Sequence, residues 1–274
     1  MDAGGNIAWK KAGVTAAFTR TDLFVTVGVV CLLGMLVWAG IAVAGEKRRI
    51  FFCASHLKTL GRTFAEYAHE HQDALPPAVV SDGTNSTSWD REIAAYLDGR
   101  WDKRKSLEQQ KAEAAKIAPA FKCPSDREPR GGADARSYSM PMYDLKKAGW
   151  PPDEQSLEGV GLYWDVQSSK KIMGADNAGG KWPAIKTSMV KAPADTALLV
   201  ERISILNALW ATKYACIVSV REQFDAKTFA ARDFHGGKMN YLFLDGHVEL
   251  LWPAQSGGHL GTGDQGLWTI RPGD

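Results

Sequence analysis

Residues 18–44 read FTRTDLFVTVGVVCLLGMLVWAGIAVA and decide the architecture of the chain. The 22 residues from Leu23 to Ala44 carry no charge, and as a helix they would measure about 33 Å. That length matches the roughly 30 Å hydrocarbon core of a bilayer and exceeds the apolar core of a cleaved secretory signal. The stretch 18–45 is therefore predicted to be a single membrane-spanning helix. Basic residues flank it on both sides, so charge alone does not orient it.

The helix is predicted to continue beyond the membrane with a different character. Apolar residues recur at intervals of three and four, which places them on one helical face. They are Ile50, Cys53, Leu57, Leu60, Phe64 and Tyr67. The pattern stops at Leu75-Pro76-Pro77, because proline cannot continue a helix. We expect an amphipathic segment over 46–74 whose apolar stripe packs on a globular domain over 75–274.

Composition excludes several classes of function. The 274 residues include 33 Lys and Arg against 31 Asp and Glu, without the basic stripe that a phosphate backbone needs. Nucleic acid is therefore not an expected partner. The sequence holds no HExxH, GxSxG or P-loop motif, so neither an enzyme nor a cofactor is expected. In His69-Glu70-His71 the two imidazoles point to different helix faces, which favours a solvated helix end over a metal site, and no metal site is predicted.

The C-terminal region predicts a β-hairpin over 238–252. Two apolar runs, 239–244 and 247–252, flank Asp245-Gly246, the dipeptide that favours a tight type I′ turn. Asp245 is interpreted as a turn residue rather than a ligand. His235 is interpreted as a loop histidine that fastens the hairpin by a hydrogen bond, with a metal ligand as the less favoured alternative.

Weaker patterns complete an α+β fold. Three further strands are predicted, at 196–200, 214–220 and 158–166, and a charged, exposed helix at 102–117. The expected soluble part is a small antiparallel sheet laid against the amphipathic half of the long helix.

The N-terminus resembles that of type IV prepilins and of the pseudopilins of type II secretion. A basic leader ends at Ala17, Phe18 follows, and an acid, Asp22, stands at the fifth position after it. The resemblance implies a leader over 1–17, cut before Phe18 by a prepilin peptidase, with methylation of the new amine. It also implies that Asp22, where the family usually has Glu, pairs with the terminal amine of a neighbouring subunit. Ala17 stands where the family prefers Gly.

A second resemblance covers most of the remaining chain. In FHGGKMNYLFLDGHVELL, His235 is followed by nine residues and then by Asp245-Gly246. This spacing is similar to the signature of a bacterial group of prepilin-like proteins with a C-terminal processing-associated domain. Further segments resemble that group in the same order: CASHLK at 53–58, the stretch from Trp89 to Leu97, FKCPSD at 121–126 and SYSM at 137–140.

Cysteine positions leave two alternatives. Cys31 falls in the membrane run, and Cys216 lies in an apolar strand and is expected to be buried and free. Cys53 faces the domain and Cys123 lies in a short Cys-Pro loop, so a disulfide between them would close a loop of about 70 residues, worth about 4 kcal/mol on a chain-entropy estimate. A disulfide and buried thiols both fit this pattern.

Two functions follow from these expectations. The first is a structural subunit of a pilus-like or pseudopilus-like filament, whose partners would be the prepilin peptidase, other pilin-like subunits and membrane lipid. The resemblance implies the bacterial inner membrane, with the C-terminal domain in the periplasm or on the cell surface. The alternative is a permanently anchored binding module that recognises a glycan or protein, for which Trp150, Trp164 and Trp182 would offer aromatic faces.

Overall fold

A computed structural model describes residues 19–81, 86–97, 105–143, 159–165, 184–210, 216–218, 234–256 and 266–270. The chain divides into two compact units, one ending at Glu46 and the other running from Lys47 to the C-terminus. The predicted leader 1–17 and Phe18 lie outside the described residues.

Helix α1, Arg20–Glu70, begins in the first unit and ends in the second. Every residue from Arg20 to Ala44 is exposed, including the whole apolar run. Among the residues that the structure describes, α1 is the one helix long and apolar enough to cross a membrane. A helix with the length and apolar character of the predicted span is thus present, which is compatible with single-pass anchoring.

The second half of α1 buries the predicted stripe from Cys53 onward, whereas Ile50 is half-buried. The helix ends at Glu70, four residues before the predicted boundary. Gln72 and Asp73 adopt positive φ angles of 58° and 63°, and the Asp73 N–H donates to the Ala68 carbonyl oxygen at 2.9 Å. A left-handed residue with this bond ends a helix in the manner of a Schellman motif, so α1 stops before the prolines are reached.

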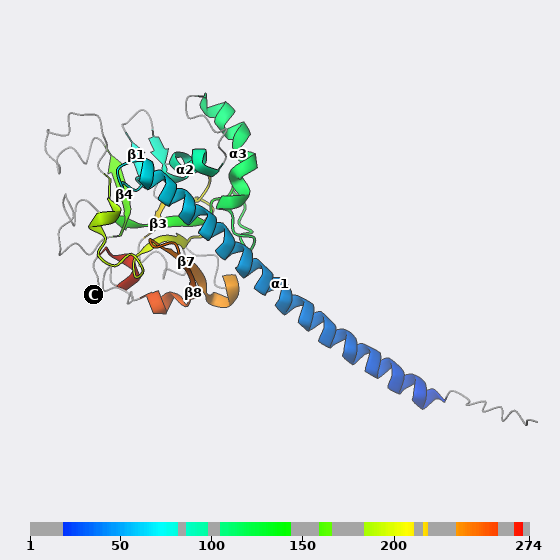
Figure 1. Ribbon diagram of the computed structural model, residues 1–274. Helices are drawn as coiled ribbons and strands as arrows, with labels where there is room; N and C mark the ends of the chain where they lie inside the picture. The colour runs from blue at the N-terminus through cyan, green and yellow to red at the C-terminus, as the bar shows by residue number, and fades with distance from the viewer. Residues whose placement is uncertain are drawn as a thin grey trace, which may run out of the picture. The chain divides into compact units, whose positions relative to one another are not determined.

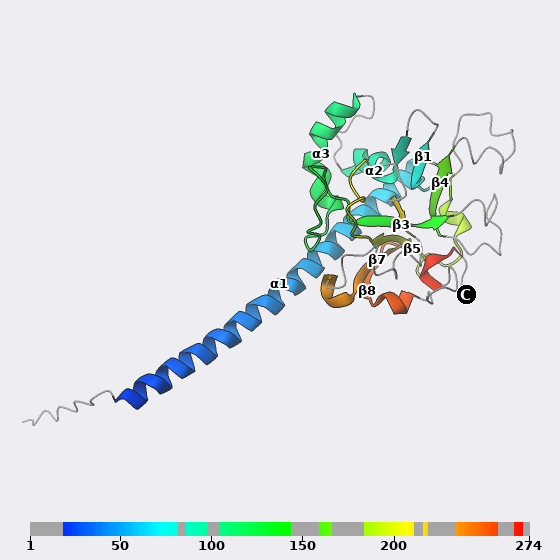
Figure 2. The same cartoon turned by 180° about the vertical axis from the view of Figure 1, so that it is seen from behind.

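The second unit contains a mixed sheet with strand order β2-β1-β4-β3-β5-β7-β8, and β6 pairs with β3 (Figures 1 and 2). The strands are β1 Val79–Ser81, β2 Ser86–Ser88, β3 Tyr138–Tyr143, β4 Gly161–Asp165, β5 Ala197–Glu201, β6 Ile217–Val218, β7 Met239–Phe243 and β8 Val248–Leu251.

The expectation of an antiparallel sheet is wrong for three of the seven strand pairings described. Strand β4 pairs in parallel with both β1 and β3, and β6 pairs in parallel with β3. The stretch β3-β5-β7-β8 and the β1–β2 pair are antiparallel. Parallel neighbours need long crossover connections, and the long connections between these strands along the chain supply them.

Helices α2 (Trp89–Leu97) and α3 (Leu107–Phe121) lie beside α1 on one face of the sheet (Figure 1). The predicted charged helix corresponds to α3, but Gln110, Ile117 and Phe121 are buried, so one of its faces is covered. Its first turn is closed by a capping box between Ser106 and Gln109. Short 3-10 turns complete the fold: η1 Thr187–Met189, η3 Phe234–Gly237, η4 Pro253–Ser256 and η5 Gly266–Trp268.

Apolar side chains cover both faces of the sheet, as the alternation along β7 predicts. Leu242 joins the large core formed with α1, α2 and α3. Tyr241 and Phe243 join a smaller core on the opposite face with Trp268. In the described part of the globular unit, the sheet therefore separates two cores.

The predicted β7–β8 hairpin is present, but its turn is not type I′. Leu242 pairs with Val248, and the Phe243 N–H donates to the His247 carbonyl oxygen, which leaves the three residues 244–246 as the loop. Only Gly246 in this loop has a positive φ, of 93°. The Gly246 N–H bonds back to the Phe243 carbonyl oxygen, as in a three-residue turn that ends in a left-handed residue.

Candidate functional site

The buried disulfide between Cys53 and Cys123 lies at the centre of the candidate site. It joins α1 to the loop that follows α3, with the two Cα atoms 4.9 Å apart and 70 residues between them in sequence. Of the two alternatives that the sequence leaves open, the structure contains the disulfide. Cys216 is free and buried, also as predicted.

His235 approaches this disulfide from the turn η3 that precedes β7. Its Nε2 atom lies 3.4 Å from Cys123 Sγ and 3.4 Å from Glu201 Oε1, and the residue is only 4% exposed. Its backbone is left-handed, with φ 48° and ψ 33°, a conformation that is unfavourable for a residue with a Cβ atom. The imidazole is therefore held against the sulfur and the carboxylate at a conformational cost.

Glu201 closes the cluster from the end of β5. It is 1% exposed, and its orientation is fixed by Asn240 on the neighbouring strand β7. The Asn240 backbone N–H donates to Oε2 at 2.7 Å, and its Nδ2 donates to Oε1 at 2.9 Å. One donor atom from each of Cys53, Cys123, Glu201 and His235 can be chosen so that all four lie within 4.8 Å of one another. His235 is thus linked to the predicted hairpin through Glu201 and Asn240.

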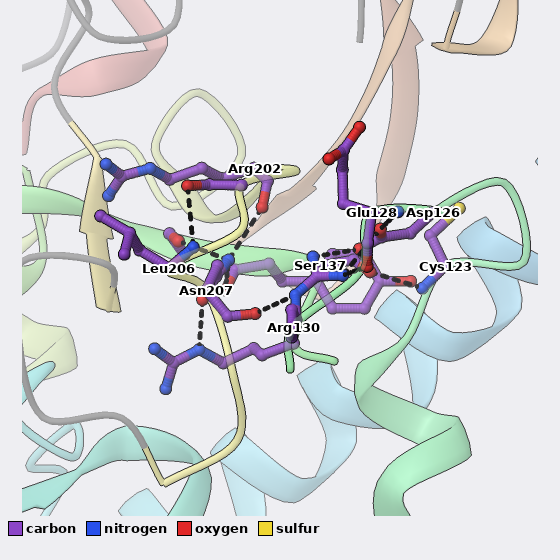
Figure 3. Close-up of polar contacts among 12 residues, drawn as sticks. Cys123, Asp126, Glu128, Arg130, Ser137, Arg202, Leu206 and Asn207 are labelled. Atoms are coloured by element: carbon purple, nitrogen blue, oxygen red, sulfur yellow. Dashed lines mark hydrogen bonds and ion pairs between the residues drawn. The ribbon is translucent and has the colours of Figure 1, made fainter. Parts of the chain in front are cut away.

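A polar network positions the Cys123 loop (Figure 3). The Cys123 N–H donates to Ser137 Oγ at 2.9 Å, and that hydroxyl donates to Asp126 Oδ2 at 2.6 Å. Arg130 forms a two-pronged ion pair with Asp126, with nitrogen–oxygen distances of 3.0 and 2.6 Å. Because both charged side chains are almost fully buried, this pair fixes the loop only while both partners are present.

The network continues to Asn207, whose carbonyl oxygen accepts from Arg130 Nε at 2.7 Å (Figure 3). Asn207 Oδ1 accepts from Arg136 Nε at 2.7 Å, and Arg136 pairs with Asp90 at 2.9 Å. Arg136 also donates to Cys216 Sγ at 3.0 Å. Burial raises the pKa of Cys216 to about 11 although Arg136 opposes the shift, so this thiol stays protonated and unreactive at neutral pH.

Asp245 and Gly246 lie in the hairpin turn. Asp245 Oδ1 accepts from the His247 N–H at 3.0 Å and lies 2.6 Å from His247 Nδ1. Partial burial raises the pKa of Asp245, but these hydrogen bonds outweigh it and leave the pKa below its ordinary value. The geometry is that of a turn residue, as predicted from the sequence.

Asp22 lies in the first turn of α1 and forms a reciprocal cap with Thr19. The Asp22 N–H donates to Thr19 Oγ1 at 3.2 Å, while Asp22 Oδ2 accepts from the Thr19 N–H at 3.0 Å and from its hydroxyl at 2.7 Å. This carboxylate therefore starts the helix, whatever further role it has. Ala17 and Phe18 lie outside the described residues.

The remaining candidate residues lie outside the cluster of Cys53, Cys123, Glu201 and His235. His69, Glu70 and His71 are exposed at the end of α1, as expected of a solvated helix end. Trp150 and Trp182 lie outside the described residues, and of Trp164 only the backbone, in β4, is described.

Sequence reasoning missed Glu201 and Asn240. Glu201 directly follows the apolar run that was predicted as a strand, and a single acid at such a position is a weak signal.

The chain matches no protein-family model, and comparisons with curated proteins and with solved structures give no match either.

Proposed function

We propose that this protein is a non-enzymatic structural subunit of a pilus-like or secretion pseudopilus-like filament, anchored in the bacterial inner membrane until it is incorporated. The observation that carries the proposal is a continuous helix that has an acid, Asp22, in its first turn and a long uncharged run directly after it. The 22 uncharged residues from Leu23 to Ala44 are all exposed and need lipid or other apolar helices around them.

The position of Asp22 adds support. Both of its side-chain bonds to Thr19 use Oδ2, and within the described part of the chain Oδ1 has no partner. An amine from a second copy of the chain would give that oxygen a charged partner. In an apolar helix bundle neither charge is stable alone, so such a pair would align two subunits at a defined stagger.

Two substitutions at Asp22 test the proposal. Asp22→Ala removes the charge that would pair with the neighbouring amine, whereas Asp22→Glu keeps a carboxylate. Both variants should still insert, because the apolar run is unchanged. Shearing intact cells should release the wild type and Asp22→Glu but not Asp22→Ala. Release of Asp22→Ala at the wild-type level would show that the carboxylate has no role in assembly.

Processing is measured separately, by mass spectrometry of the N-terminal peptide from native protein. A filament subunit should begin at Phe18 with a methylated amine. A protein that retains residues 2–17 would instead be a permanently anchored module, which contradicts the filament proposal.

A further inference from the structure

We propose that, when the Cys53–Cys123 disulfide is reduced, the two thiolates bind one Zn²⁺ ion together with His235 and Glu201. This metal site is independent of filament assembly. Its two states, disulfide and metal-bound dithiolate, would use the same two sulfur atoms and exclude each other.

Two of the donor–donor distances already fit a tetrahedral ion, and all four donor atoms lie within 4.8 Å of one another. With zinc–ligand bonds of about 2.0 to 2.3 Å, the donor atoms of a tetrahedral site lie about 3.3 to 3.8 Å apart. His235 Nε2 already lies at 3.4 Å from Cys123 Sγ and from Glu201 Oε1. The main adjustment is the separation of the two sulfur atoms once their bond is broken. The Cα atoms of the two cysteines are 4.9 Å apart and need to move little for this.

The donor set fits the chemistry of zinc. Two thiolates and an imidazole are preferred ligands of this ion, and a carboxylate completes four-coordinate sites. All four residues are buried, so the site would be closed, as structural zinc sites are. The charges sum to −1, from two thiolates, one carboxylate and Zn²⁺.

Supporting contacts orient two of the four ligands before any metal binds. Asn240 fixes the Glu201 carboxylate with two hydrogen bonds, and Ser137 fixes the backbone of Cys123. Such outer contacts are typical of metal centres. The left-handed backbone of His235 is a further sign, because strained conformations are retained where a side chain must be aimed. A disulfide by itself requires neither an imidazole nor a carboxylate beside it.

The conversion balances with a dithiol reductant, either thioredoxin-like or synthetic. The reductant supplies two electrons and two protons and becomes a disulfide, the Cys53–Cys123 bond breaks, and two thiols form. Binding of Zn²⁺ then releases the two thiol protons to solvent while sulfur–zinc bonds form. Reoxidation of the thiolates by a disulfide oxidant reverses the sequence and releases the ion.

The test uses the full chain in detergent micelles, with Zn²⁺ and Co²⁺ as probes. Reduced protein, freed of excess reductant under anaerobic conditions, should bind one Zn²⁺ per chain, and oxidised protein none. Co²⁺ should give the thiolate charge-transfer band and the intense visible bands of a tetrahedral site. Equal zinc binding by both forms, or a cobalt spectrum without thiolate charge transfer, would overturn the proposal.

Variants separate the ligands from the rest of the protein. His235→Ala and Glu201→Gln should each weaken zinc binding more than Asn240→Ala, which should lose about tenfold to a hundredfold in affinity. The matched controls are His247→Ala, which removes an exposed imidazole, and Cys216→Ser, which removes the free thiol. Both should bind as the wild type does.

Folding is checked on the oxidised form of each variant, in which the disulfide is intact and no metal is bound. Circular dichroism of this form reports whether the variant folds. Wild-type affinity in a folded His235→Ala variant would refute the site. If His235→Ala does not fold, the Glu201→Gln variant decides the question. Loss of its thiolate-to-cobalt band would support the site, and an unchanged band would refute it.

Discussion

Gly246 shows how one backbone angle fixes the C-terminal hairpin. Its φ is 93°, and a Cβ atom added there would meet nothing within 4 Å, so a side chain is opposed by conformation rather than by space. Gly246→Val should lower the free energy of unfolding by about 1–3 kcal/mol, since β-branched residues resist this region. Gly246→Asn should lose less, because Asn tolerates the left-handed conformation. Urea unfolding of the three proteins gives the comparison, and equal midpoints would exclude the proposed role of the turn.

Cys216 should give the protein a distinct sensitivity to alkaline pH. Burial raises the pKa of its thiol to about 11 from a reference value of 9.0, so the unfolded chain loses this proton first. The protonated thiol therefore contributes about 2–3 kcal/mol to the free energy of unfolding below about pH 9. This contribution should be lost as the pH rises toward 11.

Cys216→Ser is the matched control, because a hydroxyl can still accept from Arg136 but does not titrate in this range. Unfolding free energies measured across the alkaline range should fall less steeply for Cys216→Ser than for the wild type. Parallel curves would mean that the thiol titrates alike in the folded and unfolded protein.

Residue-level inference from the sequence reached the disulfide but not the whole site. The helical period placed Cys53 on the buried face of α1, and the short Cys-Pro loop made Cys123 a suitable partner. Nothing in the sequence brought Glu201 to them, because the contact depends on how β5 and β7 pair. Pairing between strands far apart in the sequence is a tertiary property that local periodicity does not encode.

At the scale of the element, two faces of the second half of α1 differ in what covers them. Phe64 is 1% exposed and its ring lies 5.5 Å from that of Trp89, whereas Phe51 on the same helix is 70% exposed. Phe64→Ala should lower the unfolding free energy by about 3–5 kcal/mol, because it leaves a cavity in the main core. Phe51→Ala is the control and should change it by less than about 0.5 kcal/mol. Similar losses in both variants would show that helix propensity, not packing, determines the effect.

Elements with a strong hydrophobic periodicity could be predicted from the sequence. The direction in which short strands pair with distant strands could not. The apolar stripe of α1 and the alternation of β7 gave the correct buried faces. The parallel pairing of β1 with β4 could not be predicted, since strands of three and five residues carry too little pattern to show their direction. The turn at 244–246 was mistaken for type I′ because the dipeptide Asp-Gly suits both turn types.

At the scale of the whole molecule, both cores belong to the unit that begins at Lys47. A fragment over 47–274 should therefore fold without the exposed apolar half of α1, stay soluble without detergent and form the Cys53–Cys123 disulfide. Size-exclusion chromatography and non-reducing peptide mapping check this. A fragment that aggregates in the absence of detergent, or that contains no linked cysteines, would show that the N-terminal half is needed for folding.

The same disulfide determines how the chain would carry a mechanical load. A pull that enters through the N-terminal half of α1 and leaves at any point beyond Cys123 crosses from one sulfur to the other. Residues 54–122 then bear none of the tension, although fully stretched they would lengthen the chain by roughly 230 Å. The end of α1, β1, β2, α2 and α3 lie within this bypassed loop, so the oxidised protein would stay short under a force that could unravel the same segment in its dithiol form.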